Sequence, residues 1–129
     1  MEENKEKYNP KEFGKELEQR TKKFAIQIIR LSSKLPNTPE GRVVKTQITK
    51  AGTSIGANYR EANRARSKSD FRNKIKICES EASECQYWLE IIIEMEWLKM
   101  EEIKSEFNES SELLALFTSI ANKSRNLKY

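Results

Sequence analysis

Apolar residues recur every three or four positions along most of the chain, a spacing that predicts amphipathic helices and not strands. The first helix is expected over residues 10–35. Asn9 and Pro10 supply a cap and a proline at the first helical position, and Pro36 removes the next backbone donor. Its apolar stripe comprises Phe13, Leu17, Phe24, Ile28, Leu31 and Leu35.

The second helix is expected over residues 39–64, after another pairing of a capping residue with a proline, Thr38 and Pro39. Gly52 and Gly56 lie inside it at a cost in helix propensity, which indicates close approach of a neighbouring helix. Its apolar stripe comprises Val44, Ile48, Ala51, Ile55 and Ala62.

Two further helices are expected over residues 69–96 and 100–124. The cap-rich segment around Ser67 opens the third helix, whose stripe comprises Phe71, Ile75, Cys78, Ala82, Cys85, Leu89 and Ile92. Ser110 and Ser111 interrupt the middle of the fourth helix. Its predicted stripe comprises Met100, Ile103, Phe107, Leu114, Phe117 and Ala121.

Four matched helices with short connections predict an all-α protein, an antiparallel up-and-down four-helix bundle forming a single domain over residues 1–129. The composition agrees, because four Gly and three Pro among 129 residues leave little material for the turns of a β-protein.

Several apolar residues lie outside the main stripes, including Ile77, Leu113, Leu116 and Ile120. One interpretation is an irregular bundle that buries them, although Ile26 lies nearly opposite the stripe of the first helix. The other is an exposed apolar surface that joins copies of the chain into a homo-oligomer. The expected oligomer interface comprises Ile26, Ile29, Trp88, Ile91 and Met95.

Charge is unevenly distributed: residues 1–76 hold 19 basic and 9 acidic side chains, whereas residues 77–113 hold 2 and 11. A basic cluster indicates RNA or DNA phosphates as partners, with Tyr59 and Phe71 as candidate stacking faces. Two alternatives are a solvated end of the bundle and attraction between subunits in a ring. The candidate nucleic-acid-binding residues are Arg60, Arg64, Arg66, Lys68, Arg72, Lys74 and Lys76.

Candidate catalytic chemistry is scarce. The chain has no His and a single Asp, which excludes imidazole bases, imidazole metal ligands and paired aspartates, so we expect no enzyme, no metal and no cofactor. Cys78 and Cys85 fall on the third helix's apolar stripe as core fillers, too far apart for one disulfide. Reduced cysteines and the absence of a signal region or membrane span predict a cytoplasmic protein.

One edge of the second helix is polar. Gln47, Ser54, Asn58 and Glu61 fall within a narrow sector beside the apolar stripe. The structural interpretation is a hydrogen-bonded network at a helix or subunit junction, and the functional interpretation is a ligand site.

These four residues, with Phe71, Glu81, Glu84 and the run Tyr87-Trp88-Leu89, resemble the four-helix-bundle proteins of the 23S rRNA intervening-sequence family. Relatives are often encoded within insertions in large-subunit rRNA genes. The accessory protein of diversity-generating retroelements is a similar protein that binds nucleic acid and a reverse transcriptase. The resemblance implies a homopentameric ring of bundles and makes a polymerase a candidate protein client.

The leading hypothesis is a non-enzymatic homo-oligomeric adaptor, pentameric by resemblance, that binds nucleic acid, preferably RNA, through residues 60–76. The alternative is a protein-interaction scaffold whose segregated charges serve only self-assembly and a protein client.

Overall fold

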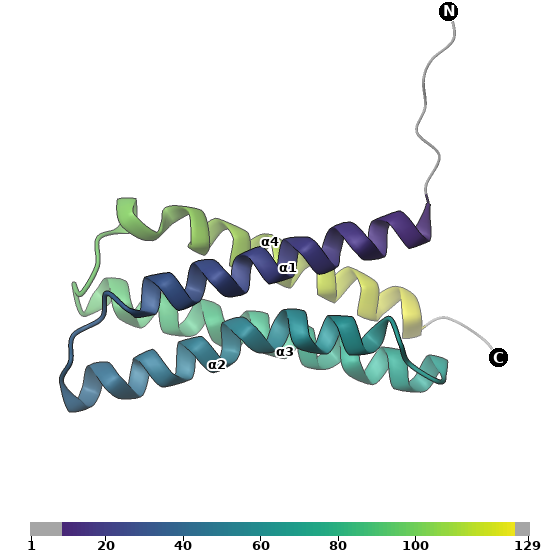
Figure 1. Cartoon of the computed structure of the whole chain (residues 1–129), viewed down its shortest axis with the longest axis horizontal. Coiled ribbons are helices and arrows are strands. Elements are labelled where there is room, and N and C mark those ends of the chain that lie inside the picture. Colours follow the sequence, from purple (N-terminus) through teal and green to yellow (C-terminus); the bar gives the residue numbers. More distant parts are fainter. Residues whose placement is uncertain (1–8, 126–129) are drawn as a thin grey trace, which may run out of the picture.

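The computed structural model describes residues 9–125, which form four long helices (Figure 1). They are α1 (Pro10–Ser32), α2 (Pro39–Ala62), α3 (Lys68–Glu94) and α4 (Met100–Arg125), and no strand occurs among the described residues. The prediction of an all-α four-helix bundle is confirmed. None of these helices is both long and apolar enough to cross a membrane.

Side-chain caps fix where the first three helices begin. The Asn9 side chain accepts hydrogen bonds from the Lys11 and Glu12 amides, and Pro10 fills the first turn of α1. Thr38 accepts from the Gly41 amide before α2, and Ser67 accepts from the Asp70 amide before α3. These bonds satisfy amides that have no partner inside the helix, which explains why the starts agree closely with the predictions.

The ends of the helices were predicted less well, by two or three residues in α1, α2 and α3. α1 ends at Ser32, where a turn ahead of Pro36 still buries Leu35. α3 ends at Glu94, and Glu96 takes a left-handed conformation with φ of 59°. The Trp97 amide then donates to the Ile92 carbonyl, a bond that closes the helix and reverses the chain.

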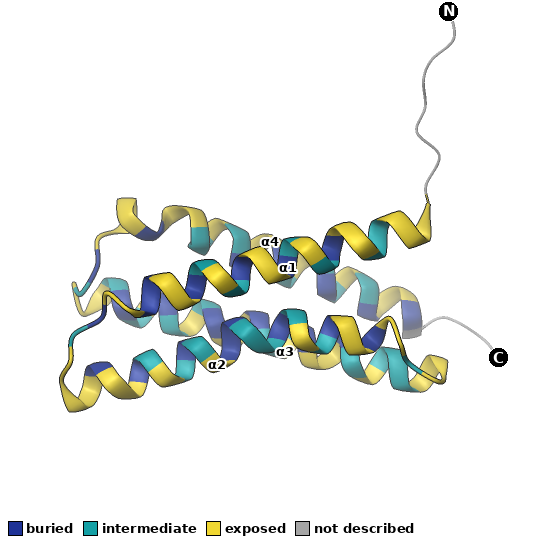
Figure 2. Cartoon of the chain, viewed as in Figure 1, coloured by how far each residue is buried: buried dark blue, intermediate teal, exposed yellow. Residues whose placement is uncertain are grey.

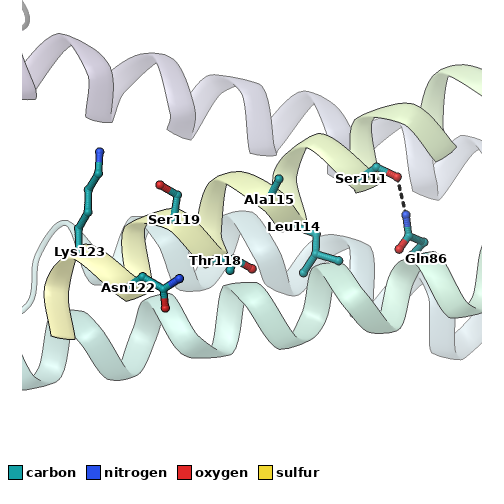
Figure 3. Close-up of a pocket in the computed structure, with 8 residues that line it drawn as sticks. All are labelled: Gln86, Ser111, Leu114, Ala115, Thr118, Ser119, Asn122 and Lys123. Atoms are coloured by element: carbon teal, nitrogen blue, oxygen red, sulfur yellow. Dashed lines mark hydrogen bonds between the residues drawn. The ribbon is translucent and has the colours of Figure 1, made fainter.

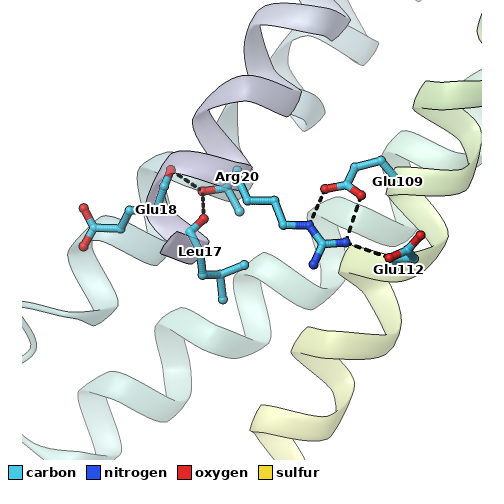
Figure 4. A network of polar contacts seen from close by, with 6 residues as sticks. Leu17, Glu18, Arg20, Glu109 and Glu112 are labelled. Carbon is cyan, nitrogen blue, oxygen red and sulfur yellow. Dashed lines mark hydrogen bonds and ion pairs between the residues drawn. The ribbon is translucent and has the colours of Figure 1, made fainter. Parts of the chain in front are cut away.

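The helices pack in chain order, so α2 contacts α1 and α3, and α3 contacts α4. Of the neighbouring pairs of helices, α1 and α4 have the least contact, and the Arg20 side chain joins them (Figure 4). Its Nε lies 2.6 Å from a Glu109 carboxylate oxygen and one of its Nη atoms lies 2.8 Å from Glu112. The hydrogen bond to Glu109 is the main reason that the pKa of Arg20 is raised.

Buried residues form one core along the inner faces of all four helices (Figure 2). Gly52 and Gly56 bring α2 close to α1, as predicted. A Cβ atom at Gly52 would lie 2.7 Å from Cγ2 of Ile28, and one at Gly56 would lie 3.1 Å from Oγ1 of Thr21.

The predicted stripe of α4 was partly wrong. Leu113 is fully buried, whereas Leu114 is only partly buried and Met100 is exposed. Ser110 is also fully buried, and its hydroxyl donates to the Phe107 carbonyl, which satisfies the polar group inside the core. A serine can therefore occupy a core position that a hydrophobic pattern assigns to its apolar neighbours.

Candidate nucleic-acid interface

The antiparallel topology gathers basic residues at one end of the bundle, where α1 and α3 begin and α2 and α4 finish (Figure 1). We call this the basic end. It carries the connection between α2 and α3, and exposed lysines of α1 and α4 join it. Sequence reasoning missed these lysines, although the predicted topology already places them there. They are Lys11, Lys15 and Lys123.

Three of the seven candidate residues are paired with carboxylates of the same chain. Arg60 Nε lies 3.5 Å from Glu18, Lys74 Nζ lies 3.9 Å from Glu61, and Lys76 Nζ lies 3.9 Å from Glu79. These cations are partly neutralised, so they offer less to a phosphate than an unpaired cation.

Arg64 and Arg66 combine exposure with the absence of a partner among the described residues. Both are exposed on the connection between α2 and α3, and neither side chain forms a hydrogen bond or ion pair with another described residue. Lys68 is exposed beside them at the start of α3. Arg72 is half-buried, and its Nε is buried without a hydrogen-bond partner.

The two candidate stacking faces differ. Tyr59 is 3% exposed and its ring packs edge-on against Phe117, with centroids 5.6 Å apart, so it is a core residue and offers no face to a base. Phe71 is half-buried and lines a cavity of about 490 Å³ at the basic end, with apolar walls that include Phe13, Leu116 and Ile120.

The far end of the bundle carries four exposed glutamates around the connection between α3 and α4. Glu94 and Glu96 follow the end of α3, and Glu101 and Glu102 occupy the first turn of α4. Exposed Lys34 and Arg42 lie at the same end, around the connection between α1 and α2, so the charge segregation of the sequence is only partly a difference between the two ends of the molecule.

An open groove of about 680 Å³ runs along α4 (Figure 3). Small and polar side chains line it, among them Ser111, Thr118 and Asn122, and Gln86 of α3 donates to Ser111 across it. Lys123 stands at the end of the groove nearest the basic end. The lining can donate and accept hydrogen bonds, but it holds no thiol, carboxylate or imidazole that could act as a nucleophile or base.

The polar edge of α2 does not form a network of its own within the subunit. The Ser54 hydroxyl donates to the Lys50 carbonyl and the Asn58 amide donates to the Ser54 carbonyl, both along the same helix. Glu61 pairs with Lys74, while Gln47 is half-buried. A role for these residues at a subunit junction stays a prediction.

The residues expected at an oligomer interface fall into two groups. Ile26, Ile29 and Met95 are exposed, at 41%, 48% and 54%. Trp88 and Ile91 are half-buried against the core, so the bundle covers part of their surface.

Both cysteines are free and fully buried in the core, as predicted. Burial raises the pKa of the Cys78 and Cys85 thiols to about 12, so both stay protonated at neutral pH. A protonated, inaccessible thiol is a poor nucleophile, and both cysteines serve packing.

Comparison with known proteins identifies the family to which the chain is related. The family model of the 23S rRNA-intervening sequence protein matches residues 15–119. A crystal structure of a protein with unknown function from the S23 ribosomal protein family of Bacteroides thetaiotaomicron is 41% identical, with a TM-score of 0.75. The match covers 81% of this chain and 96% of that one. No functionally curated protein matches the chain.

The family match extends over all four helices, from the first turns of α1 to the last turns of α4. This chain also resembles the solved relative both in sequence and in the course of its backbone. The chain therefore belongs to the 23S rRNA-intervening sequence protein family.

Proposed function

We propose that the protein is a non-enzymatic, homo-oligomeric adaptor of the cytoplasm that binds RNA through its basic end. The observation that carries this proposal is the exposure of Arg64 and Arg66, with no carboxylate among the described residues to neutralise them. Guanidinium groups in this state release counterions when they meet phosphates, which drives binding to nucleic acid. The family description, which refers to an rRNA insertion, favours RNA over DNA.

The cations at the basic end are expected to contribute unequally to RNA binding. Arg64 and Arg66 present their charge on the connection between α2 and α3, where a curved or structured backbone can approach. Arg60, Lys74 and Lys76 must first give up a carboxylate partner, so each contributes less. A protein that binds in this way recognises the charge and shape of the RNA more than its base sequence.

The test is fluorescence anisotropy with a structured rRNA fragment at low salt. The wild-type protein is expected to bind with a Kd on the order of micromolar, as sequence-independent contacts do. The variant Arg64→Ala/Arg66→Ala should bind at least several-fold more weakly. Lys99→Ala/Lys104→Ala is the matched control, because it removes two exposed cations near the far end and should leave binding nearly unchanged. Equal loss in both variants would contradict the assignment of the site.

A protein-interaction scaffold is the second candidate, and exposed apolar residues favour it. Val43 on α2, Ile77 in the first half of α3 and Met95 just after α3 are each at least 40% exposed. In that case a protein client, such as a polymerase, would take the place of RNA. No detectable RNA binding at low salt by a well-folded wild-type protein would favour this scaffold over the adaptor.

A further inference from the structure

Two surface strips of the bundle have no partner among the described residues. The first runs along the outer side of α1, where two isoleucines are flanked by two cations. Ile26 and Ile29 are exposed between Lys22 and Arg30, which are also exposed and form no ion pair with a described carboxylate. We call these four residues the α1 strip.

The second strip follows α3 and carries the opposite charge, with two glutamates set among apolar side chains. Ile77 and Met95 are exposed, and the Trp88 indole donates to the Glu84 carboxylate. We call it the α3 strip; it comprises Ile77, Glu81, Glu84, Trp88, Ile91 and Met95.

The two strips lie on different helices that do not touch. α1 and α3 occupy opposite corners of the described bundle, with α2 and α4 between them. They run in the same direction, because the bundle alternates up and down. A surface that must meet a different surface on the next copy makes a head-to-tail interface, which generates a ring or a filament.

The α1 strip lies level with the first half of the α3 strip, from Ile77 to Glu84, whereas Trp88, Ile91 and Met95 lie beyond the level at which α1 ends. Ile28 of α1 packs against Gly52 of α2, and the Cys78 thiol of α3 donates to the Ile55 carbonyl, one turn away from Gly52. Rotation about an axis parallel to the helices therefore brings the α1 strip of one copy level with Ile77, Glu81 and Glu84 of another, without sliding.

The α3 strip leans toward α2, whereas the α1 strip faces outward, with Lys22 and Ile29 on its α2 edge and Arg30 two turns beyond Lys23 on its α4 edge. Lys22 lines the groove between α1 and α2 beside Thr53, and Ile29 lies two turns further along the same edge. On α3, Glu81 lies two turns beyond Lys74, which pairs with Glu61 of α2. The two strips are different surfaces of one subunit, so a contact between them joins copies head to tail.

We propose that the α1 strip of one copy packs against the α3 strip of the next copy, so that Lys22 and Arg30 meet Glu81 and Glu84 around a contact of Ile26 and Ile29 with apolar side chains of α3. This inference rests on the proposed homo-oligomer and names the surfaces that form it. It leaves the basic end accessible on every subunit.

The environment of Glu81 agrees with a cation arriving from outside. Partial burial raises the pKa of the Glu81 carboxyl, the nearby Glu84 raises it further, and Lys50 of α2 offsets part of the effect. Lys22 or Arg30 of a second copy would relieve this repulsion, so association is stronger with ionised glutamates. The isoleucines supply apolar burial at the centre of the contact.

The experiment measures mass by light scattering coupled to size exclusion, on RNA-free protein with the fold checked by circular dichroism. Lys22→Glu/Arg30→Glu and Glu81→Lys/Glu84→Lys should each reduce the mass to that of one 15.1 kDa chain. The chain carrying all four substitutions restores opposite charges at every contact and should regain the wild-type mass. Glu90→Lys/Glu94→Lys is the control, since it changes the same charge on exposed residues of α3 outside the strip.

Unchanged mass in both double variants, or no recovery in the fourfold variant, would overturn the pairing of these two strips. A monomeric wild-type protein would overturn the pairing and the homo-oligomer together. The RNA-binding part of the proposed function is tested separately, because anisotropy on the same preparations reports the basic end. RNA binding by monomeric variants would leave that part standing.

Discussion

Substitution of Gly52 tests the close contact between α1 and α2. The methyl group of Gly52→Ala would lie 2.7 Å from Ile28 Cγ2 and 2.9 Å from Ile28 Cβ. Because Cβ is fixed to the backbone of α1, no side-chain rotation relieves this clash, and the helices must move apart. Overpacking of this kind costs about 1–3 kcal/mol. The gain in helix propensity from glycine to alanine, about 1 kcal/mol, offsets part of it.

Urea denaturation measures the net effect. With a dependence of about 2 kcal/mol per molar urea, a net loss of up to about 2 kcal/mol lowers the midpoint by up to about 1 M. Gly14→Ala is the matched control, because the nearest atom to its Cβ would lie 3.5 Å away and the midpoint should rise. A second check is Gly52→Ala combined with Ile28→Ala, whose joint cost should be smaller than the sum of the single costs. A Gly52→Ala midpoint at or above wild type would refute the argument.

Two substitutions and one measurement of thiol reactivity test other parts of the fold. Glu96→Gly removes a side chain from a left-handed position, so thermal or chemical denaturation should show about 0.5–1 kcal/mol of added stability. Arg20→Ala removes the link between α1 and α4 and should cost about 1 kcal/mol, less in high salt; no change at low salt would contradict this. The buried thiols of Cys78 and Cys85 should react with iodoacetamide at pH 8 far more slowly than in denaturant, and rapid native alkylation would show that the core opens readily.

The sequence predicted the starts of the helices well because side-chain caps act within a few residues of the chain. Asn9, Thr38 and Ser67 each bond to an amide two or three residues away, so local sequence suffices to find them. The end of α3 was harder to predict. It depends on Glu96 adopting a conformation that is usual for glycine and rare for glutamate.

The stripe of α4 was misjudged because burial depends on the neighbouring helices as well as on hydrophobicity. Leu113 and Leu114 are adjacent and equally apolar, and only packing against the other helices decides which one is buried. Ser110 satisfies its hydroxyl within its own helix, so the pattern of apolar residues gives no sign of its burial.

The sequence identified the basic segment, but it did not show which of its cations pair with carboxylates. Glu18 is distant from Arg60 in the chain and reaches it only through the register of α1 against α2. The pair of Lys74 with Glu61 likewise joins two helices, whereas Lys76 and Glu79 lie three residues apart on α3, a spacing that the sequence itself contains. The exposure of Arg64 and Arg66 follows from their place on a connection between helices, which the predicted boundaries nearly located.

The salt dependence of RNA binding tests the central claim most directly. The logarithm of the binding constant, plotted against the logarithm of salt concentration, has a slope that counts the phosphates neutralised. Arg64→Ala/Arg66→Ala should reduce the magnitude of this slope by about two for each subunit that contacts the RNA. Lys99→Ala/Lys104→Ala should keep the wild-type slope. Equal slopes for the wild type and the Arg64/Arg66 variant would show that RNA does not bind at the basic end.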